Sequence, residues 1–294
     1  MSTQVVDLDQ DAADRADYEK RSKKLINRAS RIANLAHAGQ TRKYSGLDYI
    51  MHPIAVASIV SQLEFVAASD HGYVYSAAAY LHDVIEDTKT SAEDLRAGLD
   101  GAGTAEEIDE VVKLVVQLTN VSIQDEHKSK PRADRKALDL EHIKGACKEA
   151  QAIKLADRLH NLSDVAQTLQ QTALPGAKFE RISASYARKY LGETYALLQA
   201  IGPAEPTLAR NIRSLLLSVS NVAKYRFEGE DASVEGPLGV FAAAVAVTKY
   251  KLTCPSCGLP FELSAGTGTS IEGRELGCPD CGHRAIFTLL NADH

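Results

Sequence analysis

Hydrophobic residues recur at intervals of three and four positions over most of the chain, from about residue 18 to residue 225. One such segment contains Val111, Leu114 and Leu118, which would share one face of a helix. The alternation at every second position that is typical of strands is scarce in this region. Segments rich in glycine or proline, such as 100–103, separate the helical stretches. The pattern predicts an all-α domain.

The composition changes after Phe227. Residues 228–239 are polar and contain glycine, as linkers do, and short strand-like segments follow at 250–253 and 285–289. The N-terminus is crowded with aspartates, which is typical of a solvated or frayed lead-in. We therefore predict an acidic tail over residues 1–17, a helical domain over 18–227, a linker over 228–248 and a small, mainly β unit over 249–294.

The overall composition limits the class of protein. Hydrophobic residues make up 45% of the 294, enough for a core without disulfides. The net charge of −6 argues against a generic nucleic-acid coat, which would be basic. There is no signal-peptide pattern, and the longest apolar stretch, 240–247, is far shorter than the roughly 20 residues of a membrane span. We expect a cytoplasmic protein with no membrane partner.

The segment from Ala77 to Thr88 joins an apolar face to a group of polar side chains. On a helix, at about 100° per residue, the polar side chains span an arc of about 140°, and aliphatic ones occupy the other side. Carboxylates crowded on a buried surface repel one another unless a cation compensates. A solvated acidic face is the alternative interpretation. The segment predicts a divalent-metal site around His82, Asp83, Glu86 and Asp87.

Two distant residues are further candidate ligands. His52 precedes a proline that suits a first helical turn, so its side chain can turn inward. Asp157 and Asn161 are four positions apart on an apolar helix and share a face. Taken alone, His52 would be a structural histidine, and Asp157 could equally form an ion pair with a neighbouring basic residue.

Four motifs around these residues resemble the hydrolase domain of the bifunctional Rel/Spo alarmone enzymes and the stand-alone small alarmone hydrolases. These enzymes belong to the His-Asp (HD) phosphohydrolases, which are helical. The resemblance covers roughly residues 25–200. The motifs are Gln40-Thr-Arg-Lys43, Tyr49-Ile-Met-His-Pro53, Leu81-His-Asp-Val-Ile-Glu-Asp-Thr88 and Lys154-Leu-Ala-Asp-Arg-Leu-His-Asn161.

The resemblance implies a catalytic metal and an acid/base pair. Two imidazoles and two carboxylates suit Mn²⁺ or Fe²⁺, with Zn²⁺ also possible. A bound metal lowers the pKa of its water and supplies hydroxide near neutral pH. Glu86 and Asp87 would form the general acid/base pair beside that water. The metal ligands implied are His52, His82, Asp83 and Asp157.

The resemblance also implies nucleotide contacts. Arg42 and Lys43 would meet the nucleotide, and Asn161 would help to hold its sugar. Lys154 and Arg158 could stabilise phosphate charge, with ordinary surface pairing as the alternative. Five other histidines have no evident chemical partner and are interpreted as structural or exposed: His37, His71, His127, His142 and His160.

Family members remove the 3′-pyrophosphate of guanosine tetra- or pentaphosphate, which is the leading function here. Two features depart from the pattern: an extra residue after Lys43, and an unusual sequence in residues 131–138 and 148–152. Rival functions are therefore an HD phosphohydrolase acting on another nucleotide, such as NADPH, or on an RNA 3′ end, and a nucleotide sensor or adaptor without turnover. The complete set of ligands and acid/base residues argues against the sensor.

The C-terminal unit carries two Cys-x-x-Cys-Gly sequences separated by 20 residues. Four thiolates in such pairs close a tetrahedral, structural Zn²⁺ site, so the unit resembles a zinc ribbon. A redox role for one pair would not explain the second pair. With four Lys/Arg against five Asp/Glu over 249–294, protein contact or homo-oligomerisation is favoured over nucleic-acid binding. The expected zinc ligands are Cys254, Cys257, Cys278 and Cys281.

Overall fold

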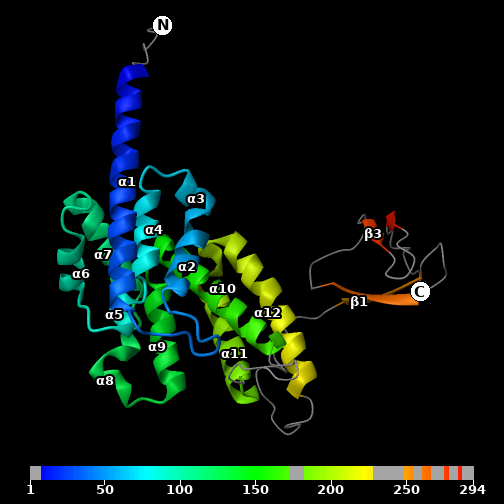
Figure 1. Cartoon of the computed structure of the whole chain (residues 1–294). Helices are drawn as coiled ribbons and strands as arrows, with labels where there is room; N and C mark the ends of the chain where they lie inside the picture. Colours follow the sequence, from blue (N-terminus) through cyan, green and yellow to red (C-terminus); the bar gives the residue numbers. More distant parts are fainter. Residues whose placement is uncertain are drawn as a thin grey trace. The chain divides into compact units, whose positions relative to one another are not determined.

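The computed structural model describes residues 8–171 and 182–227, and four short strands between residues 248 and 286. The chain divides into two compact units, Met1–Ala232 and Ser233–His294. The described part of the first unit is helical (Figure 1). Its helices are α1 (Leu8–Ala36), α2 (Met51–Ser61), α3 (Glu64–Ala67), α4 (Gly72–Leu81), α5 (Val84–Asp87), α6 (Ala92–Leu99), α7 (Ala105–Leu118), η1 (Val121–Ile123), α8 (Asp125–Lys128), α9 (Arg132–Lys144), α10 (Lys148–Gln171), α11 (Ala184–Ile201), η2 (Gly202–Ala204) and α12 (Pro206–Phe227).

Helix α4 lies at the centre of the first unit and packs against α1, α2 and α7. Three consecutive alanines, 77–79, are fully buried in it, and such small side chains let neighbouring helices approach closely. Helix α10 packs against α2, α7 and α12. These contacts bring the start of α2, the end of α4 and the middle of α10 together. The metal-ligand candidates lie at these three places.

Two helices begin with capping boxes. The hydroxyls of Ser91 and Thr104 accept backbone N–H bonds at the third position of α6 and α7, where Asp94 and Glu107 bond back to the cap. Glu107 is also buried, and it accepts hydrogen bonds from Tyr73 of α4 and Arg21 of α1. This carboxylate therefore ties α1, α4 and α7 together.

The prediction of one continuous helix over residues 77–88 was wrong in its middle. Helix α4 ends at Leu81, His82 and Asp83 form a turn, and α5 begins at Val84. The backbone of Asp83 departs from helical geometry at φ −102° and ψ −3°. At the N-terminus, α1 begins at Leu8, inside the acidic segment.

The described part of the second unit consists of two antiparallel strand pairs. Strand β1 (Thr248–Thr253) pairs with β2 (Pro260–Ala265), and β3 (Glu275–Gly277) pairs with β4 (Arg284–Ile286). β1 contains the predicted strand 250–253, and β4 contains the start of the predicted strand 285–289. The four cysteines of the predicted zinc ribbon lie outside the described residues, as does most of the predicted linker.

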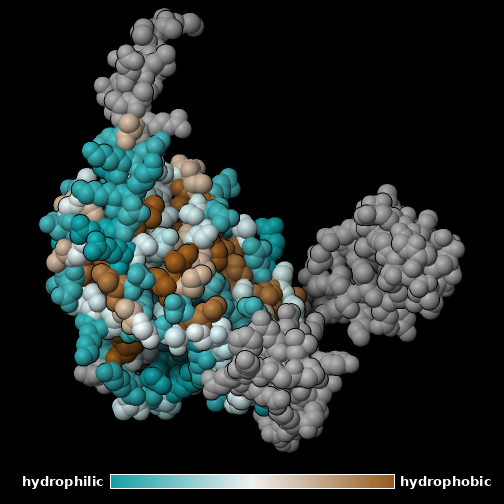
Figure 2. All heavy atoms as spheres, viewed as in Figure 1, coloured by the Kyte–Doolittle hydropathy of each residue, from teal (hydrophilic) through white to brown (hydrophobic). Residues whose placement is uncertain are grey.

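The visible face of the described helices carries mostly hydrophilic side chains, with smaller hydrophobic areas between them (Figure 2). Among the residues that the structure describes, we find no helix with the length and apolarity that crossing a membrane requires.

Candidate metal and nucleotide site

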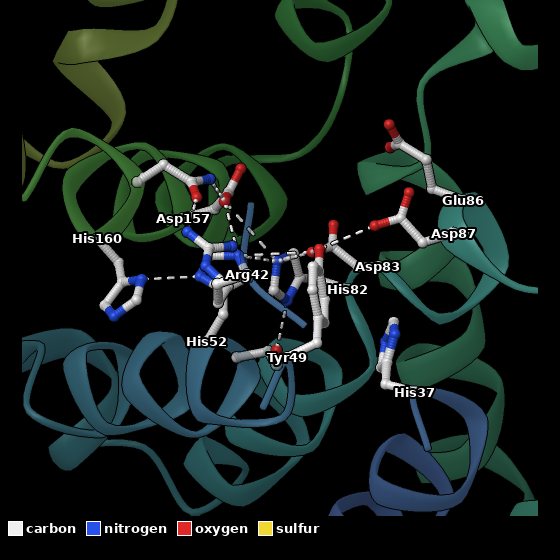
Figure 3. Close-up of polar contacts among 12 residues, drawn as sticks. His37, Arg42, Tyr49, His52, His82, Asp83, Glu86, Asp87, Asp157 and His160 are labelled. Atoms are coloured by element: carbon white, nitrogen blue, oxygen red, sulfur yellow. Dashed lines mark hydrogen bonds and ion pairs between the residues drawn. The ribbon is translucent and has the colours of Figure 1, made fainter. Parts of the chain in front are cut away.

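Three helical segments deliver a cluster of potential metal ligands (Figure 3). His52 comes from the first turn of α2, His82 and Asp83 from the turn between α4 and α5, and Asp157 from α10. His52 Nε2 lies 3.2 Å from His82 Nε2 and 3.1 Å from Asp157 Oδ1. Asp83 Oδ2 lies 3.0 Å from His82 Nε2 and 3.4 Å from His52 Nε2. All four side chains are nearly inaccessible to solvent.

Hydrogen bonds on the far side of each imidazole orient these two rings. His82 Nδ1 lies 2.8 Å from the carbonyl oxygen of Ala79, which can only accept, so Nδ1 carries the proton. His52 Nδ1 lies 2.8 Å from His160 Nδ1. In both rings Nε2 therefore points into the cluster. This is the arrangement by which a protein orients metal-binding histidines.

The cluster attracts positive charge. Burial alone would lower the pKa of His82, but Asp83 and Asp157 outweigh it and raise this pKa to about 10. Burial acts in the opposite sense on the two carboxyl groups, yet His82 beside Asp83 and Lys154 beside Asp157 hold both pKa values well below their usual range. Two imidazole nitrogens facing two ionised carboxylates form a donor set that fits a divalent transition metal.

Glu86 and Asp87 lie beside this cluster, on the side away from His160 (Figure 3). Asn120 donates its backbone N–H and its side-chain amide to the Glu86 carboxylate. The hydroxyl of Tyr49 contacts Asp83 Oδ2 at 2.7 Å and Asp87 Oδ2 at 2.8 Å. Burial, together with the Asp83 charge, raises the pKa values of both Glu86 and Asp87. Raised pKa values suit groups that exchange protons near neutral pH.

A pocket of about 340 Å³ adjoins the cluster. Arg42, the candidate nucleotide contact, lines it and bonds to Asn161 Oδ1 and Asp164 Oδ2, both at 2.6 Å. Asn161 in turn donates to Asp157, so one hydrogen-bond chain joins the pocket to the cluster. Lys43 also lines the pocket, with its ammonium over the ring of Tyr186.

The two basic residues of α10 that are candidate phosphate contacts differ in position. Lys154 Nζ lies 3.5 Å from Asp157 Oδ2, and its charge also acts on Glu86, so it belongs to the site. Arg158 packs over the ring of Tyr190 and bonds to Thr194, both on α11. Arg158 therefore joins α10 to α11.

The sequence interpretation missed four residues of this site. It treated His160 as structural or exposed, and it gave no role to Tyr49, Asn120 or Asp164. His160 is three positions after Asp157, so helical spacing already placed it on the same side of α10. Tyr49 is three positions before His52 in the same motif. Asn120 is distant in sequence from the carboxylate that it binds, so spacing gave no signal.

Comparison with known proteins identifies one matching family model and several similar proteins that are named for the same activity. Residues 29–181 match the model of the HD domain family. Over 134 residues the chain is 41% identical to guanosine-3′,5′-bis(diphosphate) 3′-pyrophosphohydrolase of Haemophilus influenzae, covering 45% of this chain and 17% of that protein. Over 147 residues it is 33% identical to the pyrophosphohydrolase MESH1 of Xenopus tropicalis, covering 48% of this chain and 69% of that protein. The chain thus spans less than a fifth of the bacterial relative.

The fold of the chain is similar to the solved structure of a metazoan ortholog of SpoT that hydrolyzes ppGpp. The TM-score is 0.51 and the sequence identity 24%, and the match covers 66% of this chain and 94% of the other. At this identity the likeness supports the helical fold.

Proposed function

The chain belongs to the HD domain family, and from this premise we propose that it is a metal-dependent nucleotide pyrophosphohydrolase that removes the 3′-pyrophosphate of guanosine tetra- or pentaphosphate. One observation carries the proposal: Nε2 of each of the two buried histidines lies 3.0–3.8 Å from an oxygen of both buried aspartates, with two further carboxylates beside them. The activity for which the similar proteins are named supports guanosine polyphosphate as the substrate.

The proposed metal is Mn²⁺ or Fe²⁺, held by His52, His82, Asp83 and Asp157. Mixed imidazole and carboxylate ligands favour these ions. When bound, such a cation polarises water and neutralises phosphoryl oxygens. The four side chains come from three separate segments of the helical unit, so their positions depend on the packing of α2, α4 and α10.

In the proposed reaction, water attacks the phosphorus next to the 3′ oxygen, and the bond between that phosphorus and the 3′ oxygen breaks. One of Glu86 and Asp87 takes the proton of the attacking water, and the leaving 3′ oxygen gains a proton from a carboxylic acid of the same pair or from solvent. The tetraphosphate gives GDP and pyrophosphate, and the pentaphosphate gives GTP and pyrophosphate. The bonds from Asn120 and Tyr49 keep the two carboxylates beside the reacting phosphate.

Basic side chains at the site are proposed to bind the substrate. Lys154 lies next to Asp157 and Glu86, where it can stabilise charge on the 3′-pyrophosphate. Arg42 and Asn161 join the cluster to the pocket, where the nucleoside would lie. Lys43 lies at the aromatic side of that pocket. Arg158, which packs against α11, is assigned no substrate contact.

We also propose that the C-terminal unit is a structural zinc ribbon. The support is its pair of Cys-x-x-Cys-Gly sequences and the antiparallel strands β1–β2 and β3–β4. Its acidic net charge favours a protein partner, including a second copy of the chain, over nucleic acid.

The test is to incubate the chain with guanosine tetraphosphate and Mn²⁺ and to measure the release of GDP and pyrophosphate by chromatography. Asp83→Asn should reduce release to background, because it removes a charged ligand of the cluster. Glu141→Gln is the matched control, since Glu141 is an exposed carboxylate of α9 paired only with Lys144 among the described contacts, and it should hydrolyse at the native rate. No release by the native chain would reject this substrate. The same assay would then use NADPH and RNA 3′ ends.

A further inference from the structure

Two side chains that line the pocket are hydrogen-bonded to the metal cluster. Tyr49 and Asn161 line the pocket, and they also donate hydrogen bonds to Asp83 and Asp157. A nucleotide whose phosphate groups reach the cluster would therefore place its nucleoside in this pocket. Its volume of about 340 Å³ lies within the usual range for small-molecule sites.

Three tyrosines form an aromatic wall of the pocket. The rings of Tyr186 and Tyr190 on α11 are nearly parallel, with centroids 5.9 Å apart and 15° between their planes. Tyr44 meets Tyr186 edge-on at 5.8 Å. Aromatic walls of this kind bind planar bases without regard to their identity. Helix α11 follows residues 29–181, which match the family model, so Tyr186 and Tyr190 belong to the part of the chain outside the match, while Tyr44 lies within it.

Asp164 supplies what the aromatic wall lacks, which is a polar group able to distinguish one base from another. It lines the pocket, and its side chain is 25% exposed. Arg42 bonds through Nε and Nη2 to a single oxygen, Oδ2, at 3.0 and 2.6 Å. Within residues 8–171 and 182–227, Oδ1 accepts no hydrogen bond. One carboxylate oxygen is thus held in place while the other can accept bonds from a ligand.

We propose that Asp164 selects guanine over adenine, an assignment that rests on the proposed nucleotide hydrolase function. Guanine presents two adjacent donors on its Watson–Crick edge, N1–H and the 2-amino group, and the open Oδ1 has lone pairs to accept from both. Adenine presents an acceptor, N1, at the corresponding position, and a carboxylate opposite that lone pair is repelled. The Arg42 bonds fix the orientation of the Asp164 carboxylate in the pocket.

This assignment is tested by calorimetric measurement of the equilibrium binding of GDP, IDP and ADP to the full chain in the presence of Mn²⁺. A polar contact that engages two donors of a base edge corresponds to a preference of about 10- to 100-fold, so native protein should bind GDP that much more tightly than ADP. IDP keeps N1–H but lacks the 2-amino group, and its affinity should lie between the two. Asp164→Asn should lower the GDP-to-ADP preference about tenfold or more, because its amide can donate to adenine N1.

Asp164→Glu is the matched variant, because it keeps the carboxylate and should still prefer GDP. Far-UV circular dichroism checks that both variants fold, and the series of three nucleotides on native protein tests the assignment without any variant. Equal native affinity for GDP and ADP would overturn it. An equal loss of affinity for GDP and ADP in Asp164→Asn would also overturn it, since Asp164 would then only position Arg42. In either case, continued hydrolysis of guanosine tetraphosphate would leave the proposed function standing, whereas binding of none of the nucleotides together with no hydrolysis would overturn both.

Discussion

At the scale of single residues, His160 is the clearest addition to the predicted site. Its Nδ1 contacts Nδ1 of His52 at 2.8 Å, behind the face that His52 turns toward the other ligands. Burial and the neighbouring His52 lower the pKa of His160 to about 4, so it is neutral and can accept the Nδ1 proton of His52. It therefore holds His52 in the tautomer that leaves Nε2 available to a metal.

We predict that His160→Phe weakens Mn²⁺ binding about 10- to 100-fold, the usual effect of losing a residue that orients a metal ligand. His160→Gln, which can still accept from His52, should restore part of the affinity. Calorimetric titration with Mn²⁺ measures both variants. His71→Gln, at the exposed start of α4, is the histidine control. Unchanged Mn²⁺ affinity in His160→Phe would contradict the positioning role.

Tyr49 leads to a prediction about pH. Its hydroxyl bonds to Asp87 and lowers the pKa of that carboxyl, against the larger effect of burial, which raises it. In Tyr49→Phe the pKa of Asp87 rises further. Whether Asp87 acts as base or acid, the limb of the pH–rate profile that depends on its proton should move to higher pH. The profile of kcat for native and Tyr49→Phe protein checks this. A shift to lower pH would exclude Asp87 as the titrating group.

The sequence predicted the metal-ligand candidates because their types and spacing are unusual. A His-Asp pair followed one turn later by Glu-Asp, on an otherwise apolar segment, is rare because charged side chains are seldom buried without a partner. Asp164 could not be found in this way, because a single aspartate after a leucine and a serine is an ordinary feature of a helix surface. Its significance comes from Arg42, which is 122 residues away in sequence and reaches it only in the folded chain.

At the scale of elements, periodicity predicted the helical class but not the local break at the ligands. The apolar spacing of Ala77–Thr88 suits an uninterrupted helix, yet the chain turns at His82 and Asp83. Both side chains point into the cluster, where each contacts His52. The periodicity of apolar residues indicates which side chains of a helix are buried. It does not record the tertiary contacts that make a break in the helix favourable at these two residues.

The two capping boxes allow a matched test of how much stability a buried capping carboxylate adds when it also links helices. Glu107 and Asp94 hold the same position in α7 and α6, but Glu107 is buried and also accepts from Tyr73 and Arg21. Glu107→Ala should lower the free energy of unfolding by about 3 kcal/mol, because the buried Tyr73 hydroxyl and the half-buried Arg21 lose their acceptor. Asp94→Ala should have a clearly smaller effect. Urea unfolding measures both, and similar losses would show that the links to α1 and α4 add little stability.

At the scale of the whole molecule, the ligand candidates connect parts of the helical unit that are far apart in sequence. His52 and Asp157 are separated by 105 positions in the chain, and their side chains lie 3.1 Å apart at the junction of α2 and α10. The pattern along the chain indicated which residues these were, while the packing of α10 against α2 and α7 determines that they meet. Unfolding would separate them, so a metal bound by all four side chains binds only the folded unit.

The helical unit should therefore be stabilised by Mn²⁺. For a ligand that binds only the folded state, a free concentration 100 times the Kd adds about 2.7 kcal/mol to the free energy of unfolding. The full chain, first treated with a chelator and then titrated with Mn²⁺, should show a melting temperature that rises with the logarithm of free Mn²⁺ above the Kd. Far-UV circular dichroism reports chiefly on the helices, so it follows the first unit. Asp83→Asn should show a smaller response and Glu141→Gln the native one. A melting temperature that stays constant at Mn²⁺ concentrations that saturate hydrolysis would mean that the four side chains do not bind the catalytic metal together.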